Sequence, residues 1–391
     1  MRGMLTHEVE TDAAGFIRTQ VALGKRDCAT IVADTVEFLH GYGDPDELRA
    51  LAWRLVGPRF AEHLEAQATW PERTDSDRLT DAFRALDAAG IVAREDFACC
   101  QNCGVSEIGA EATEAAPARG YVFYHLQDAE RAAEGGSLWL AYGLFDPSGD
   151  QAAAGAEVVA AVRAQGLHVD WDGSAGQRIH VRLKWARRRA GRLAAYVTGL
   201  AGTDVAVEVT KGRLRLPPAM DVAVVTQLLL PWLPEGVRVK VGALVVHREH
   251  HRLVSDDGRA VGRFDGLRLI RGEEAVAGEE PGLLDVTYEY LPTGPSEGAS
   301  RPMVLPELLD VVRRLPTRTD SWLSAISATG GIVQMRYEDG RLWLETPHPD
   351  EGAATGKHAS LEEAERMLTV LATEDRVAIA ELDGVTTQRW H

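Results

Sequence analysis

Three of the four cysteines of this chain lie within five positions, in the stretch FACCQNCG. Cys100 and Cys103 form a Cys-x-x-Cys pair, a spacing at which two thiolates can bind one tetrahedral metal ion. Gly104, directly after the pair, suits the tight turn that such sites use. We expect Cys99 to point away from the pair, and Cys28 is distant. The cysteines therefore supply only two of the four ligands that a structural zinc site needs.

The missing ligands are predicted to come from the segment YHLQD. His125 and Asp128 end a predicted strand, 121–126, that follows the cysteine loop and can return beside it. Imidazole nitrogen and carboxylate oxygen are both common zinc ligands. The sequence thus predicts one metal site, with zinc as the metal and Cys100, Cys103, His125 and Asp128 as its ligands.

The same residues are compatible with other interpretations. His125 could activate a cysteine as a thiolate while Asp128 or Glu130 orients the imidazole, which would make a nucleophilic site. A Cys-x-x-Cys pair is also the spacing at which one thiol resolves the other in redox chemistry. A buried cysteine can equally pack as a small hydrophobic residue. Metal binding, thiol chemistry and simple packing all remain open at this point.

The elements around the cysteines follow an alternating pattern. Asp44 and Pro45 begin a predicted helix that Gly57 and Pro58 interrupt, and TDSDRLTDAFRALDAAG predicts a second helix directly before the cysteines. After them come strands in YVFYHL, SLWLAYGLF, HVDWDG and RIHVRLKWARR, with helices in QDAERAAEGG and QAAAGAEVVAAVRAQG. Such alternation predicts a small α/β layer whose helices cover the sheet.

The rest of the chain is richer in β pattern. From about Gly191 short alternating strands and one apolar helix are expected, and residues 292–302 read as a linker rich in proline, glycine and serine. LPELLDVVRRL and TDSWLSAISATG read as helices, IVQMRY and RLWLET as a hairpin, and SLEEAERMLTVLATE as a helix with a capping box at Ser360 and Glu363. We expect a multidomain α+β or α/β protein: a helical N-terminal part, small mixed sheets covered by helices, and a C-terminal unit of two strands and a helix. The predicted domains are 1–190, 191–291 and 303–391.

Residues 44–190 resemble a family of uncharacterised bacterial proteins, a domain of unknown function. The segments WPERTDSDRLTDAFRALDAAGIVAREDFACCQNCG, GYVFYHLQDAERAAEGGSLWLAYG and AGAEVVAAVRAQGLHVDWDGS carry the likeness. Residues 321–391 also resemble small bacterial immunity-type proteins, through paired strands followed by the SLEEAERML helix. Neither resemblance implies a chemical activity.

Composition limits the partners. The formal net charge is −17, from 59 acidic against 42 basic residues, so the chain repels phosphate backbones and anionic lipid. The one basic run, residues 182–192, is interpreted as a charged edge strand. No apolar run is long enough to span a membrane, and no signal peptide pattern is present. We therefore expect a cytoplasmic protein with a protein partner and no affinity for nucleic acid or membranes.

Two classes of function follow. The first is a non-enzymatic binding or regulatory protein with a candidate structural metal site. The alternative is a metal- or thiol-dependent enzyme whose site lies between the cysteine cluster and YHLQD. No complete catalytic triad or cofactor fingerprint can be assembled from the sequence, which favours the first class.

Overall fold

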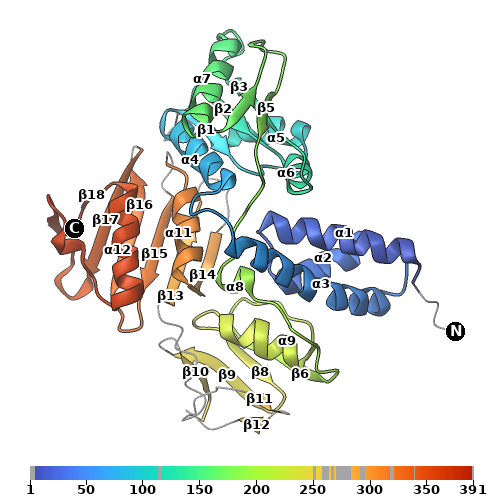
Figure 1. Ribbon diagram of the computed structural model, residues 1–391. Coiled ribbons are helices and arrows are strands. Elements are labelled where there is room, and N and C mark those ends of the chain that lie inside the picture. The colour runs from blue at the N-terminus through green and yellow to red at the C-terminus, as the bar shows by residue number, and fades with distance from the viewer. Residues whose placement is uncertain are drawn as a thin grey trace.

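The computed structural model describes residues 5–112, 117–249, 252–257, 264–265, 268–269, 283–290, 296–317, 321–338 and 340–389. Within them lie a helical N-terminal part, a small α/β layer, a small β sheet and a larger C-terminal sheet with helices (Figure 1). The predicted mixed class of helices and small sheets is confirmed. In this described part of the chain, no helix is both long and apolar enough to cross a bilayer.

Three helices form the N-terminal part: α1 (His7–Leu23), α2 (Cys28–Phe38) and α3 (Pro45–Ala68). The Asp44 carboxylate caps α3 as predicted, by accepting from two backbone N–H groups of the first turn. The predicted interruption at Gly57 and Pro58 is wrong, because α3 continues through both residues. Gly57 is needed for another reason, since a Cβ there would lie 2.9 Å from the carbonyl oxygen of Val197.

The α/β layer follows the predicted alternation in its second half. Its elements are α4 (Asp75–Ala88), β1 (Ile91–Arg94), α5 (Gln101–Glu107), the 3-10 helix η1 (Ile108–Glu111), β2 (Gly120–Phe123), α6 (Leu126–Ala133), β3 (Leu138–Leu144), α7 (Gln151–Ala164), β4 (His168–Asp170) and β5 (Ile179–Arg182). From β2 onward the order of elements is as predicted, but the helix α4 does not lead directly to the cysteines, because β1 lies between them, and α5 and η1 follow the cysteines unpredicted. The strand order is β1-β2-β3-β5-β4, and only β1 and β2 are parallel.

Each face of this sheet has its own core, because successive side chains of a strand point to opposite faces. Val122 and Tyr124 pack with residues of α4, α6 and α7. Phe123 packs on the other face, with Ile108 of η1 and with Phe97. The chain around the cysteines thus covers one face of the sheet and the longer helices cover the other.

The basic run 182–192 is not an edge strand. β5 lies between β3 and β4, so the predicted interpretation is wrong. Past β5 the run crosses the N-terminal helices, where Arg189 is 1% exposed and donates to the carbonyl oxygens of Val21 and Arg26. Arg187 forms a buried ion pair with Glu95. These guanidinium groups hold the first two parts of the chain together.

The third part begins after α8 (Gly191–Ala194) and is mostly β structure. Its sheet has the order β10-β9-β8-β6-β7 and packs against a short apolar helical segment. The elements are β6 (Asp204–Lys211), β7 (Ala219–Asp221), α9 (Val222–Val224), η2 (Val225–Leu229), η3 (Leu230–Trp232), β8 (Arg238–Val241), β9 (Leu244–Glu249) and β10 (Arg252–Ser255), with the pair β11 (Phe264–Asp265) and β12 (Arg268–Leu269) beyond them.

The C-terminal sheet has seven strands, more than the predicted pair. Its elements are β13 (Leu284–Glu289), β14 (Ser296–Met303), α11 (Leu305–Arg314), β15 (Trp322–Ile326), β16 (Ile332–Glu338), β17 (Arg341–His348), η4 (Pro349–Glu351), β18 (Ala353–His358), α12 (Leu361–Glu374), η5 (Ile379–Glu381) and β19 (Thr386–Arg389). The order is β14-β13-β15-β16-β17-β18-β19, and every pair of neighbours is antiparallel.

Two local predictions in this region are wrong. The segment predicted as a helix, TDSWLSAISATG, contains strand β15, because its apolar residues Leu323 and Ala325 alternate onto one face of the sheet. The predicted linker 292–302 contains most of β14, and residues 291–295 lie outside the described residues. The capping box of Ser360 and Glu363 is confirmed at the start of α12.

The α/β layer contacts the C-terminal unit directly. Asp87 of α4, which is 3% exposed, accepts hydrogen bonds from the backbone N–H (2.8 Å) and the hydroxyl (2.7 Å) of Thr317. Arg84, on the same helix, donates to the carbonyl oxygen of Arg313 at 3.2 Å. The boundaries of the predicted domains stay a prediction.

Candidate metal centre

The cysteine loop leaves β1 through two residues with an unusual backbone. Asp96 and Ala98 have φ values of 49° and 61°, in the left-handed region that costs a residue with a Cβ about 1–2 kcal/mol. Two hydrogen bonds hold this conformation: the N–H of Phe97 donates to Tyr124, and the N–H of Leu126 donates to Ala98. The loop therefore lies against the end of β2, which confirms its predicted position beside residues 121–126.

Helix α5 starts at the cysteines and packs closely on the sheet. Cys100 is its N-cap residue, in extended conformation, and Cys103 lies in its first turn. Gly104 is buried in this helix, where a Cβ would come within 2.4 Å of the Phe123 ring. The predicted turn role of Gly104 is wrong; the glycine is required for close packing between α5 and β2.

Three sulfur atoms meet at this helix start. The Sγ atoms of Cys99, Cys100 and Cys103 all lie within 4.8 Å of one another, and those of Cys99 and Cys103 are 3.5 Å apart. The prediction that Cys99 points away is wrong, because its Sγ lies beside that of Cys103 in α5. Cys99 is exposed and the other two are partly buried.

Cys100 and Cys103 differ in their ease of ionisation. The pKa of Cys100 is lowered, chiefly because the backbone N–H of Cys103 donates to its sulfur. The pKa of Cys103 is raised to about 12, because its thiol bonds to those of Cys99 and Cys100 and faces their negative charge. Cys100 is thus the first of the two to become a thiolate. A bound cation would offset the repulsion that opposes ionisation of the second.

His125 and Asp128 lie next to this loop but interact with each other. His125 is the N-cap residue of α6: its Nδ1 accepts from the backbone N–H of Asp128 at 3.3 Å, and its Nε2 lies 2.9 Å from the Asp128 carboxylate. The fully buried Asp128 also pairs with Arg131 and Arg178. Burial lowers the pKa of His125, so its neutral form is favoured.

Among the predicted ligands, the structure thus brings Cys100 and Cys103 together and adds Cys99. In the described part of the chain, the group of clustered ligand atoms consists of these three cysteines. Metal binding by His125 and Asp128 stays a prediction. The structure shows His125 and Asp128 as the capping box of α6. The sequence contains the signal for this role, because a cap residue followed three positions later by an acid is typical of a capping box, although histidine is the cap here.

Three thiolates that lie close together are suited to bind a soft cation. Thiolate sulfur binds Zn²⁺ at about 2.3 Å and also prefers Cu⁺ among the common transition metals. Because Cys99 is exposed, a metal held by the three sulfurs would have one side toward solvent. Three protein ligands and an open position distinguish such a site from a closed structural zinc site.

The cysteine loop lies in the part of the chain that matches a known protein family. No curated protein and no solved structure matches the chain. The resemblance of residues 321–391 to immunity-type proteins stays a prediction. A family model does match, and its region starts earlier than the predicted 44–190, so it includes the N-terminal helices. Residues 6–189, with the whole cysteine loop, match the family described as "Domain of unknown function (DUF6891)".

Proposed function

We propose that this chain is a non-enzymatic metal-binding protein in which Cys99, Cys100 and Cys103 hold one thiophilic cation, with zinc as the leading candidate. The observation that supports this most directly is the approach of all three Sγ atoms to within 4.8 Å. Three soft donors this close can contact one ion after small side-chain rotations, because sulfurs bound to the same Zn²⁺ lie at most about 4.6 Å apart.

A binding or regulatory role fits the surroundings better than catalysis. The nearest base predicted from the sequence, His125, is 5% exposed and its ring is engaged by Asp128. The sulfurs, in contrast, lie at the surface. The open position of the metal would then be filled by water or by a side chain of a protein partner, so that partner binding depends on the metal.

Metal titration tests the proposal. The reduced protein should bind one equivalent of Zn²⁺ in competition with a chromophoric chelator. Cys103→Ser should weaken binding at least about 100-fold, more than the loss of an outer-sphere partner does. Cys28→Ala is the matched control, because Cys28 is buried in α2 and outside the cluster. Stoichiometry well below one, or an equal loss in the Cys28→Ala variant, would remove the metal site.

A second candidate function rests on the 3.5 Å between the sulfurs of Cys99 and Cys103. These two thiols could form a disulfide, in which case each sulfur loses one hydrogen and hydrogen peroxide, as oxidant, is reduced to water. Peptide mapping after mild oxidation should then show this pair and no other. If bound zinc blocks oxidation and zinc-free protein still forms no Cys99–Cys103 disulfide, the redox role is excluded and metal binding stands.

A further inference from the structure

The C-terminal sheet presents two different faces. Side chains of β15, β16 and β17 such as Leu323, Val333 and Leu344 form the core with α11 and α12. The alternate residues point away from these helices. Among them Trp322, Arg336 and Trp343 occupy one register row, because Arg336 pairs with Trp322 on one side and with Trp343 on the other.

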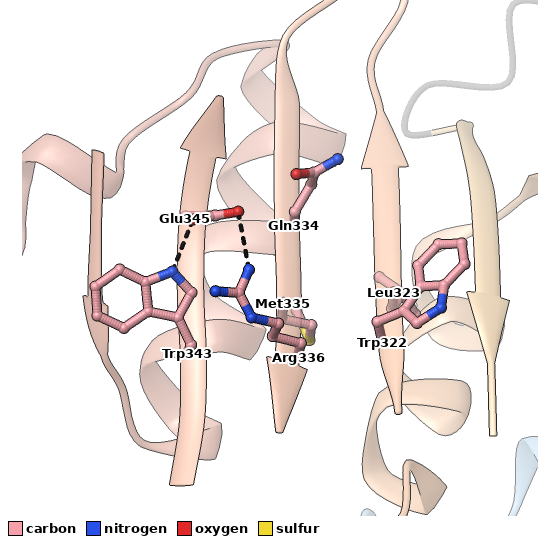
Figure 2. A pocket seen from close by; sticks show the side chains of 7 residues that line it. All are labelled: Trp322, Leu323, Gln334, Met335, Arg336, Trp343 and Glu345. Atoms are coloured by element: carbon pink, nitrogen blue, oxygen red, sulfur yellow. Dashed lines mark hydrogen bonds and ion pairs between the residues drawn. The ribbon is translucent and has the colours of Figure 1, made fainter. Parts of the chain in front are cut away.

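A pocket of about 200 Å³ lies on this outer face, far in sequence from the cysteines. Figure 2 shows its lining, with the two indoles on either side of Arg336 and with Gln334 and Glu345 beside it. Trp343 is buried and Trp322 is partly exposed, while 45% of the Arg336 side chain reaches solvent. The pocket is therefore accessible and has aromatic walls.

Each indole holds a carboxylate at the edge of this pocket. The Nε1–H of Trp343 donates to Glu345 at 2.7 Å, and that of Trp322 donates to Glu289 at 3.3 Å. Arg336 pairs more closely with Glu338, at 2.6 Å, than with Glu345, at 3.5 Å. The nearest partners of Glu345 and Glu289 are thus neutral indole donors, and Glu345 has Arg336 as a more distant second partner.

Two aromatic faces and two such carboxylates suit a cation. A lysine or arginine head group is attracted both by an indole face and by a carboxylate, while its apolar stem can pack on the ring. Among the side chains that the structure describes, the charged groups beside this pocket are two arginines, Arg336 and Arg341, against three glutamates, Glu289, Glu338 and Glu345. Their charges sum to −1. The whole chain, at −17, would attract basic partners over a longer range.

We propose that this face binds a basic segment of a protein partner, with one arginine or lysine side chain inserted between Trp322 and Glu345. Tryptophan and arginine are the residue types most enriched at the energetic centres of protein interfaces, and here they form one row. This inference goes beyond the proposed metal site, because the two sites lie on different units and share no residue.

Calorimetry on the full chain tests it, with a hexapeptide of alternating arginine and glycine as the probe. Saturable binding is expected, weakened at least about tenfold by Trp322→Ala and about three- to tenfold by Glu345→Gln. The amide oxygen introduced by Glu345→Gln can still accept from Trp343, so folding is preserved, and thermal melting checks both variants. Glu381→Gln is the matched control, since Glu381 is 64% exposed on the same unit and outside the pocket.

Three results would overturn the proposal. One is the absence of saturable binding at about 1 mM peptide, the weak limit of useful recognition. Another is an equal loss in the Glu381→Gln control, which would mean unspecific attraction to an acidic surface. The third is binding of a neutral oligosaccharide such as maltotriose at Trp322 in place of the arginine peptide.

Discussion

Two neighbouring segments of the α/β layer, the cysteine loop and the YHLQD segment, are joined by backbone hydrogen bonds but differ in what their donor atoms do. At the loop, three sulfurs gather at the surface, bonded only weakly to one another. At the second segment, the Asp128 carboxylate is fully buried and bonds to His125, Arg131 and Arg178. Both segments contain residue types that bind metals. Only in the first segment are the donor atoms not already held by strong interactions within the protein.

This difference shows how to separate a ligand set from a structural network. A carboxylate that already balances buried guanidinium groups can coordinate a metal only if those ion pairs break, which costs several kcal/mol. Exposed thiols lose little when they exchange a weak sulfur contact for a metal bond. The criterion is therefore whether a donor atom is free to leave its present partners.

The largest effect is expected from Asp128→Asn. The variant leaves Arg178 without its buried counter-charge and should lower the free energy of unfolding by about 3–5 kcal/mol, measured by urea denaturation. The matched control is Asp150→Asn, because Asp150 caps α7 through Ala153 and makes no ion pair in the described structure. Asparagine caps as well as aspartate, so this control should stay within about 0.5 kcal/mol of the parent.

The zinc affinity of the Asp128→Asn variant makes the same test more specific. If Asp128 is structural, its folded variant still binds Zn²⁺ with parental affinity at a temperature below its unfolding transition. If the affinity falls while the fold is intact, Asp128 is a ligand after all, and the contrast between the two segments fails.

Gly104→Ala should have the next largest effect. The new Cβ would lie 2.4 Å from the Phe123 ring, so α5 must shift, at a cost of about 1–3 kcal/mol. Because α5 positions Cys100 and Cys103, zinc affinity should fall as well. Gly109→Ala is the control, since nothing lies within 4 Å of its Cβ position. Equal stability of both variants would mean that α5 does not pack on Phe123.

Ala98→Gly should have the smallest effect, with the opposite sign. Glycine adopts the left-handed conformation of residue 98 without strain, which should raise stability by about 0.5–1 kcal/mol after its larger unfolded-state entropy is included. Ala160→Gly, an exposed site inside α7, should instead cost about 1 kcal/mol. Both changes are measured by urea denaturation, and a loss of stability in the Ala98→Gly variant would show that the loop is not strained there.

Several elements along the chain could be predicted because their signals are local. The cap at Asp44, the box at Ser360 and Glu363, and the strand predicted at 121–126 and observed as Gly120–Phe123 all depend on residues within a few positions of one another. The segment of β15 could not be distinguished from a helix in this way, because its strand pattern is completed only by long-range pairing with β13 and β16. The same is true of β14 in the predicted linker.

The amino-acid sequence alone establishes that three of the four cysteines are concentrated in one segment, that this segment lies between a predicted helix and a predicted strand, and that the chain is acidic. The structure adds strand β1 before the cysteines and helix α5 after them. Which donors meet depends on the tertiary fold. In a loop with two left-handed residues the Cys99 sulfur lies beside that of Cys103, and packing engages Asp128 with Arg178, which lies 50 positions away. The fold also buries Arg187 and Arg189. Residue type and spacing define what a side chain can bind, but only long-range packing decides which partners it has.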